Sequence, residues 1–251
     1  YDVVGMPTTW GVPAHKDNFP SANALSVDRL LDAGVVLFGK TNVPVHLADW
    51  QSFNAIYGTT NNPWDLKRGP GGSSGGSAAA LAAGLTGLDA GSDIGASIRN
   101  PAHYCGVYGH KPTYGVVSPR GQALPGKFST ADISVIGPMA RSADDLALAL
   151  GVMSGPDLID GVGWQLSLPP ADRVGLRDYK VGVMYTDEQA EVDEEVQQVL
   201  RKLVACLIDA GVDVDENARP EFNMGQAHRN YIQLLRAATS SRMNDREMER
   251  N

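Results

Sequence analysis

The chain has 251 residues, 43% of them hydrophobic, with 28 Gly and 15 Pro, a composition typical of a globular protein with many tight turns. Its 21 Lys and Arg stand against 29 Asp and Glu, so the formal net charge is −8, which disfavours nucleic acid or an anionic membrane surface as a partner. No apolar run approaches the roughly 18 residues of a membrane-spanning helix. We therefore expect a small uncharged substrate and no insertion into a membrane.

The two cysteines, Cys105 and Cys206, show neither Cys-x-x-Cys spacing nor a Cys/His pattern that suits a metal. We predict that both are reduced, buried thiols of a cytoplasmic protein and that no metal is bound. Because the first residue is Tyr1 rather than Met, we also expect residues upstream of it.

Local patterns predict the elements of the first half of the chain. Apolar residues with helical spacing over residues 22–34 predict a helix, and residues 35–39 predict a short buried strand. Residues 42–76 are polar and rich in Pro and Gly, which is typical of a loop. The alanine-rich residues 77–85 predict a helix that other elements can approach closely.

In the second half, Ser142 with Asp145 three positions later has the pattern of a capping box and predicts a helix that ends near Met153. Apolar periodicity predicts four more elements: strand 180–185, helix 192–211, strand 212–214 and helix 224–239. This alternation predicts an α/β fold. We treat residues 1–251 as a single domain and expect a connection between two lobes around residues 155–177, where Pro169 and Pro170 are adjacent.

Two segments rich in Gly and Ser, residues 71–77 and 91–99, carry the chemistry. A glycine-rich backbone can turn its N–H groups toward a ligand, so each segment is a candidate oxyanion or phosphate site. No Gly-Lys-Ser/Thr follows the first segment, which argues against a nucleotide-phosphate loop of the usual kind.

A serine becomes a nucleophile only when a base takes its proton. Residues 71–75 match the Gly-x-Ser-x-Gly elbow of α/β-hydrolases, in which a histidine such as His103, His110 or His228 would be the base. That elbow requires a strand immediately before the serine. Residues 61–70 contain two prolines and few strand formers, so this interpretation is disfavoured.

The two segments, together with the motifs at residues 40–44, 62–64 and 105–113, resemble the amidase signature family, strongly from residue 1 to about 140 and more weakly beyond. The resemblance implies an α/β fold with a mixed, twisted central sheet and helices on both faces. It also implies hydrolysis of a carboxamide through an acyl-enzyme, without a metal or organic cofactor.

The resemblance implies that Ser97 is the nucleophile and that Ser73, which follows a cis peptide bond, passes the proton to the base. It implies that the amides of Ile94, Gly95 and Ala96 form the oxyanion hole. It also implies that Leu47, Trp50 and Gly72 lie against the substrate. The family's catalytic lysine is expected before residue 1. Lys16 is a poor substitute because it follows the turn at residues 7–9 that the family places after the lysine. Ala96 stands where the family more often has Gly, and we expect a negative φ there.

Alternatives remain for the assembly and the activity. The chain could be the glutaminase subunit of a tRNA-dependent amidotransferase complex, although residues 116–126 look more like the stand-alone amidases. It could also be a catalytically inert fragment. A homodimer is one assembly that the sequence allows.

Overall fold

The structure is a computed structural model that describes residues 1–125, 131–170 and 175–240. The chain forms two compact units, a first built mainly from Tyr1–Leu166 and a second built from Ser167–Arg236. Whether the whole chain acts as one domain with a lobe connection stays a prediction.

The central sheet of the first unit has three antiparallel strands in the order β3 (Leu88–Asp93), β5 (Val135–Ala140) and β4 (Tyr108–Gly109). Gly91 and Gly137 are paired across β3 and β5. All six residues of β5 are buried, because this strand has a neighbour on each edge and helices on its faces.

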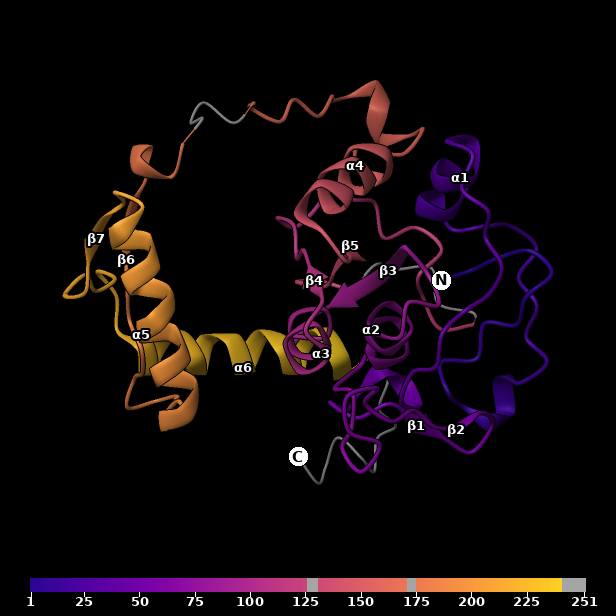
Figure 1. The fold of residues 1–251 in the computed structure, drawn as a ribbon. Helices are drawn as coiled ribbons and strands as arrows, with labels where there is room; N and C mark the ends of the chain where they lie inside the picture. Colours follow the sequence, from indigo (N-terminus) through magenta and orange to yellow (C-terminus); the bar gives the residue numbers. More distant parts are fainter. Residues whose placement is uncertain (126–130, 171–174, 241–251) are drawn as a thin grey trace. The chain divides into compact units, whose positions relative to one another are not determined.

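Helices cover both faces of this sheet, as Figure 1 shows. On one face, Met139 of β5 packs with residues of α2 (Gly75–Ala82) and α3 (Arg99–Cys105). On the other face, Ile136 packs with the end of α4 (Ala143–Met153). The two strand residues lie on opposite faces because they are three positions apart and successive side chains alternate. The predicted α/β fold with helices on both faces is confirmed.

The positions of three residues of β3 follow from the same alternation. Asp89, Gly91 and Asp93 share the face that α2 and α3 cover. A Cβ atom on Gly91 would lie 2.9 Å from both Ser74 Oγ and Ile98 Cγ1, so only glycine lets the two helical segments approach the strand this closely. The end of β3 is therefore packed against the start of α2.

The helix predicted near the start of the chain is α1 (Leu25–Asp32), and Gly34 ends it with a φ of 87°. Arg29 on this helix donates to four consecutive carbonyl groups at the end of α4: Met153, Ser154, Gly155 and Pro156. The last carbonyls of α4 have no partner within the helix, so the guanidinium supplies the missing donors.

The predicted N-cap at Ser142 is confirmed, since its hydroxyl accepts from Asp145 N at 3.1 Å, but the Asp145 carboxylate accepts from this hydroxyl at 2.8 Å and not from the Ser142 backbone N–H that a full capping box would engage. The buried strand predicted at residues 35–39 is wrong. These residues pair with no strand in the described part of the chain, and Val36 and Phe38 are 83% and 72% exposed.

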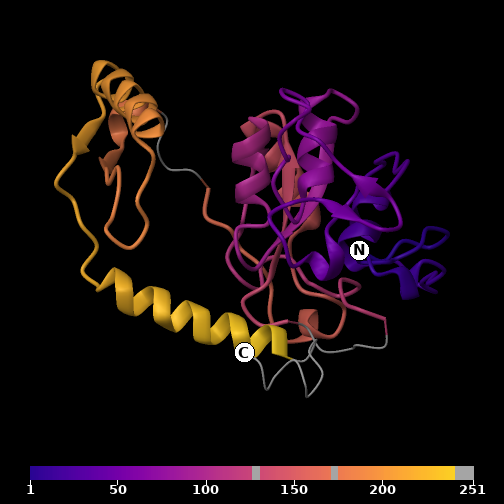
Figure 2. The same cartoon turned by 90° about the horizontal axis from the view of Figure 1, so that it is seen from below.

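The second unit contains the parallel strands β6 (Lys180–Gly182) and β7 (Asp213–Asp215), joined through α5 (Glu194–Asp209), and most of α6 (Met224–Ser240). Figure 2 shows α5 beside the two strands. The predicted strand, helix and strand are confirmed, with shorter strands than expected. Val204 is the buried residue of α5.

Short elements complete the fold: the β1 (Phe53–Asn54) and β2 (Gly58–Thr59) hairpin, and the 3-10 turns η1 (Pro13–His15), η2 (Val45–Leu47), η3 (Asp160–Val162) and η4 (Leu176–Asp178).

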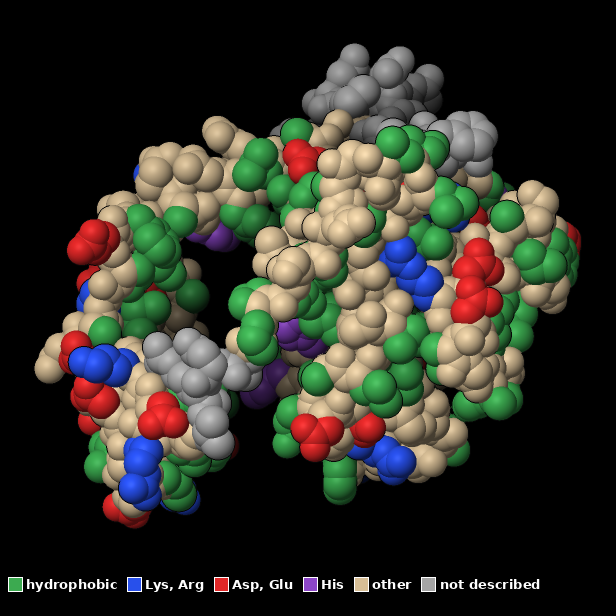
Figure 3. Space-filling model, turned by 90° about the horizontal axis from the view of Figure 1, so that it is seen from above, with side chains coloured by type: hydrophobic (Ala, Val, Ile, Leu, Met, Phe, Trp, Pro, Cys, Tyr) green, Lys and Arg blue, Asp and Glu red, His purple; other side chains and the backbone are tan. Residues whose placement is uncertain are grey.

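Hydrophobic side chains are also exposed over the surface, as on the face in Figure 3, and on α5 they include Val199 and Leu203. No helix among the described residues is long and apolar enough to span a lipid bilayer. Cys105 is buried as predicted, whereas Cys206 is exposed, which corrects the prediction.

Candidate active site

The two Gly and Ser segments meet where α2 and α3 begin. The Ser74 N–H donates to the Ser97 carbonyl at 3.1 Å, and the Gly72 N–H donates to Asn100 Oδ1 at 3.2 Å. Both Ser73 and Ser97 are buried, with 2% and 6% of their surface exposed. The Gly72–Ser73 peptide bond is cis, as the resemblance implies. No hydrogen bond joins the two hydroxyls in the described part of the chain, so proton transfer between them stays a prediction.

Asp93 organises the loop that carries Ser97. Its carboxylate accepts from the N–H groups of Ala96 at 2.9 Å and Ile98 at 3.1 Å. The Arg99 guanidinium donates to both carboxylate oxygens at 3.0 Å, so the two residues form an ion pair. Burial alone would raise the pKa of Asp93, but Arg99 and the backbone donors hold the pKa below its ordinary value. Asp93 is therefore a fixed negative charge at neutral pH.

The peptide group between Gly95 and Ala96 is held at both ends. Its N–H, which belongs to Ala96, donates to Asp93, and its carbonyl, which belongs to Gly95, accepts from Trp50 Nε1 at 2.8 Å. The N–H groups of Gly95 and Ser97 donate to no acceptor among the described residues. Ala96 N–H, expected in the oxyanion hole, is therefore already engaged, whereas the amides on either side of it are available.

Ala96 has a φ of 71°, so the negative φ expected from its side chain is wrong. The left-handed conformation lets Ala96 N–H reach back to Asp93 while the Ala96 carbonyl accepts from Asn100 N at 2.7 Å. A residue with a Cβ atom adopts this conformation at a cost of about 1–2 kcal/mol. Hydrogen bonds on both sides hold the residue there.

Two of the three residues expected against the substrate lie close together. A Cβ atom on Gly72 would collide with the backbone oxygens of Asp49 and Gln51, which places this glycine directly against the segment that carries Trp50. Trp50 is 56% exposed. Leu47 is half-buried in η2 and has a φ of 56°. Their contact with a substrate stays a prediction.

The lysines and histidines weighed as bases lie elsewhere. Lys16 is exposed beside Asp17, and His103 and His110 are exposed, with no hydrogen bond to Ser73 or Ser97 among the described residues. Lys40, not singled out from the sequence, donates to Pro7 O at 2.8 Å and to Thr8 Oγ1 at 2.9 Å. Burial lowers the pKa of Lys40 to about 8.

Asp89 is a second carboxyl near these loops that was not predicted from the sequence. Burial raises the pKa of this carboxyl to about 6, and hydrogen bonds from Ala90 N and the Ser77 side chain oppose the shift. Ser77 in turn shares a hydrogen bond of 2.9 Å with Thr41. The signal that could have revealed this position is the two-residue spacing of Asp89, Gly91 and Asp93 in a strand.

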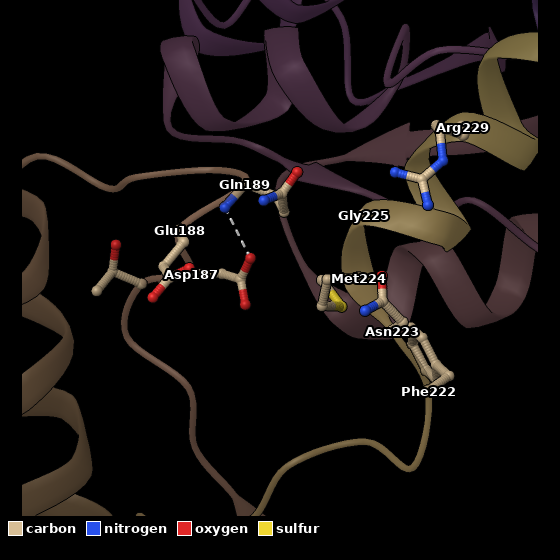
Figure 4. Close-up of a pocket in the computed structure, with 9 residues that line it drawn as sticks. Asp187, Glu188, Gln189, Phe222, Asn223, Met224, Gly225 and Arg229 are labelled. Carbon is tan, nitrogen blue, oxygen red and sulfur yellow. Dashed lines mark hydrogen bonds between the residues drawn. The ribbon is translucent and has the colours of Figure 1, made fainter.

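A cavity of about 720 Å³ lies in the second unit, between the segment after β6 and the start of α6, as Figure 4 shows. Its lining mixes acidic, amide and apolar side chains with Arg229, and none of the expected site residues contributes to it. Among the residues that the structure describes, no group of three or more His, Cys, Asp or Glu could hold a metal ion.

Comparison with known proteins agrees with this arrangement. The family described as Amidase matches residues 1–250. A curated relative, the A subunit of glutamyl-tRNA(Gln) amidotransferase from Cyanothece sp. (strain PCC 7425 / ATCC 29141), is 39% identical over 88% of this chain and 46% of its own length. The chain thus spans about half the length of the curated relatives it matches.

Two solved structures share the fold. The A subunit of glutamyl-tRNA(Gln) amidotransferase from Thermotoga maritima is 30% identical with a TM-score of 0.83, over 99% of this chain and 55% of the other. A bacterial aryl acylamidase of the amidase signature family is 27% identical with a TM-score of 0.80, over 99% and 51%. The match along residues 1–250, together with the packed serine segments, shows that this chain belongs to the amidase signature family.

Proposed function

We propose that the protein hydrolyses a carboxamide bond by acyl transfer to Ser97. The observation that carries the proposal is the packing of the 71–74 loop against the 94–97 loop, through the bond from Ser74 N to Ser97 O at 3.1 Å. This packing holds two buried serines next to backbone amides that have no acceptor among the described residues. A nucleophile, a proton relay and donors for an oxyanion are the parts that acyl transfer needs.

In the proposed reaction, Ser97 Oγ attacks the amide carbon, and its proton passes through Ser73 to the lysine that the family resemblance implies. The carbonyl oxygen becomes an oxyanion. The C–N bond then breaks, the nitrogen takes a proton and leaves as an amine or ammonia, and an ester of Ser97 remains. Water attacks this ester, releases the carboxylic acid and returns the proton to Ser97.

The N–H groups of Gly95 and Ser97 are the proposed donors to the oxyanion. They flank the Gly95–Ala96 peptide group, whose own N–H is bound by Asp93 at 2.9 Å. Loss of one donor of this kind typically costs about 3–4 kcal/mol of transition-state stabilisation. Asp93 contributes by fixing the loop, because its charge is bound to Arg99 and to backbone amides.

The substrate that fits best is a small uncharged amide, bound against Leu47, Trp50 and Gly72. The net charge of −8 argues against a polyanionic substrate. A cytoplasmic location and a homodimer stay predictions. The mass measured in solution by light scattering tests whether the protein is a homodimer.

One observation favours a second activity. Two curated relatives that match this chain, at 39% and 38% identity, are named as A subunits of glutamyl-tRNA(Gln) amidotransferase, so hydrolysis of glutamine within a larger complex is the alternative. A stand-alone amidase hydrolyses aryl anilides or aliphatic amides without a partner. A component of an amidotransferase requires candidate partner subunits for glutamine hydrolysis and co-elutes with them in size-exclusion chromatography.

Mass spectrometry after treatment with a fluorophosphonate tests the nucleophile. The Ser97 oxygen displaces fluoride from phosphorus, so the expected label lies on Ser97 and disappears in Ser97→Ala. Ser142→Ala removes a hydroxyl at the start of α4 and is the matched control that keeps the label. A label on another residue would overturn the assignment, and no label on a wild-type protein that includes the lysine implied by the resemblance would favour a catalytically inert chain.

A further inference from the structure

Trp50 forms a hydrogen bond to the 94–97 loop, and a side chain that only lines a substrate pocket would not need this bond. Its indole Nε1 donates to the Gly95 carbonyl at 2.8 Å across 45 positions of sequence. This carbonyl belongs to the peptide group whose N–H is bound by Asp93 at 2.9 Å. The peptide group can therefore rotate only if both hydrogen bonds break.

We propose that Trp50 is a positioning residue that orients the Gly95–Ala96 peptide group and thereby aims the flanking N–H groups of Gly95 and Ser97 at the oxyanion. The inference rests on the proposed function. A hydrogen bond at each end of the peptide group restrains ψ of Gly95 and φ of Ala96, and any change in these two angles that is not equal and opposite also turns the adjoining amides. Ala96 is already in the left-handed region at a φ of 71°, where alanine is unstable without outside restraints.

The exposure of Trp50 explains why this bond serves catalysis more than stability. The side chain is 56% exposed, so water competes for the indole N–H and the bond adds little to the stability of the free protein. A substrate that covers the indole excludes this water, and the hydrogen bond becomes stronger in the drier site. Substrate binding would then restrain the loop at the moment when an oxyanion forms.

Trp64 provides a matched control. Its indole Nε1 also donates to a backbone carbonyl at 2.8 Å, that of Cys105, and the side chain is 74% exposed. It is an exposed tryptophan with the same kind of bond, but its acceptor lies at the end of α3 and not in the 94–97 loop. Replacement of either tryptophan by phenylalanine removes the N–H and keeps an aromatic ring.

The test compares Trp50→Phe with Trp64→Phe in amide hydrolysis and in the rate of fluorophosphonate labelling at Ser97. We expect Trp50→Phe to lower kcat and the labelling rate about tenfold, part of the roughly hundredfold or greater loss seen when an oxyanion donor is removed outright. KM should stay within about twofold, and Trp64→Phe should leave both rates unchanged. Replacement of Trp50 by 3-benzothienylalanine keeps the shape without the N–H and should reproduce the loss, even where phenylalanine disturbs folding.

Three outcomes would contradict either the positioning role of Trp50 or the proposed function. A change confined to KM would make Trp50 a pocket wall only and overturn the inference. Wild-type rates for the benzothienylalanine protein would overturn it as well, because the N–H would then be dispensable. If the wild-type protein neither takes the label at Ser97 nor hydrolyses amides, the proposed function itself fails, and that result is seen before any Trp50 variant is measured.

Discussion

Replacement of Ala96 by glycine should stabilise the protein, although Ala→Gly changes usually destabilise. Ala96 has a φ of 71°, and the left-handed conformation costs a residue with a Cβ atom about 1–2 kcal/mol that glycine does not lose. Glycine has more freedom in the unfolded chain, which offsets about 0.4–1 kcal/mol of this gain. The net expectation is a rise of about 0.5–1 kcal/mol in the free energy of unfolding. For a chain of this size that corresponds to roughly 1–4 °C in Tm.

Urea unfolding followed by circular dichroism measures this change as a higher midpoint at an unchanged m-value. Ala83 is the control, because it is exposed at the end of α2 with a φ of −79°. Ala83→Gly should destabilise by about 0.5–1 kcal/mol. If both variants lose stability to the same extent, the left-handed conformation of Ala96 and the argument built on it are refuted.

Three further predictions concern carboxylates and a helix cap. Asp89 has a pKa of about 6 against 3.8 in the unfolded chain, so its burial lowers the stability of the protein as pH rises from 4 to 6. Asp89→Asn should therefore raise the free energy of unfolding by up to about 3 kcal/mol above pH 7 and leave it unchanged below pH 4. Urea titrations at several pH values measure this difference. The pKa of Asp93 is lowered, so the stabilisation that its charge provides is present at neutral pH and lost in acid. Asp93→Asn should lower the free energy of unfolding by about 2–3 kcal/mol at pH 7 and lower kcat at least tenfold. The unfolding midpoints of the wild-type and variant proteins should converge below the ordinary carboxyl pKa. Ser142→Ala should cost about 1 kcal/mol through loss of the cap on α4 and leave kcat unchanged, and a fall in kcat would contradict the separation of this cap from the site.

Local sequence was sufficient for elements whose causes lie within a few residues. The cap at Ser142 and the end of α1 at Gly34 each act within about one helical turn, and the apolar stripe of α5 repeats every three or four residues along its 16 residues. The same holds for the motifs that contain Ser73 and Ser97, because the resemblance is carried by contiguous residues. These parts of the fold and of the candidate site could be predicted from the order of the residues alone.

Elements that exist only through distant partners could not be predicted in this way. β5 contains Gly137 and Pro138, which disfavour a strand, yet it lies between two strands and is buried along its whole length. Residues 35–39 show the opposite case, because an apolar run that suits a strand finds no strand to pair with among the described residues. Strand formation depends on neighbours that sequence spacing does not specify.

The fine geometry of the site was likewise decided by tertiary structure. The φ of Ala96, the bond from Trp50 to Gly95 and the enclosed carboxyl of Asp89 all depend on residues brought together from separate segments. The sequence by itself determined which hydroxyls are candidates for chemistry. Only the folded chain decided which amides remain available to an oxyanion, because the direction of an N–H group depends on every hydrogen bond that holds its peptide plane.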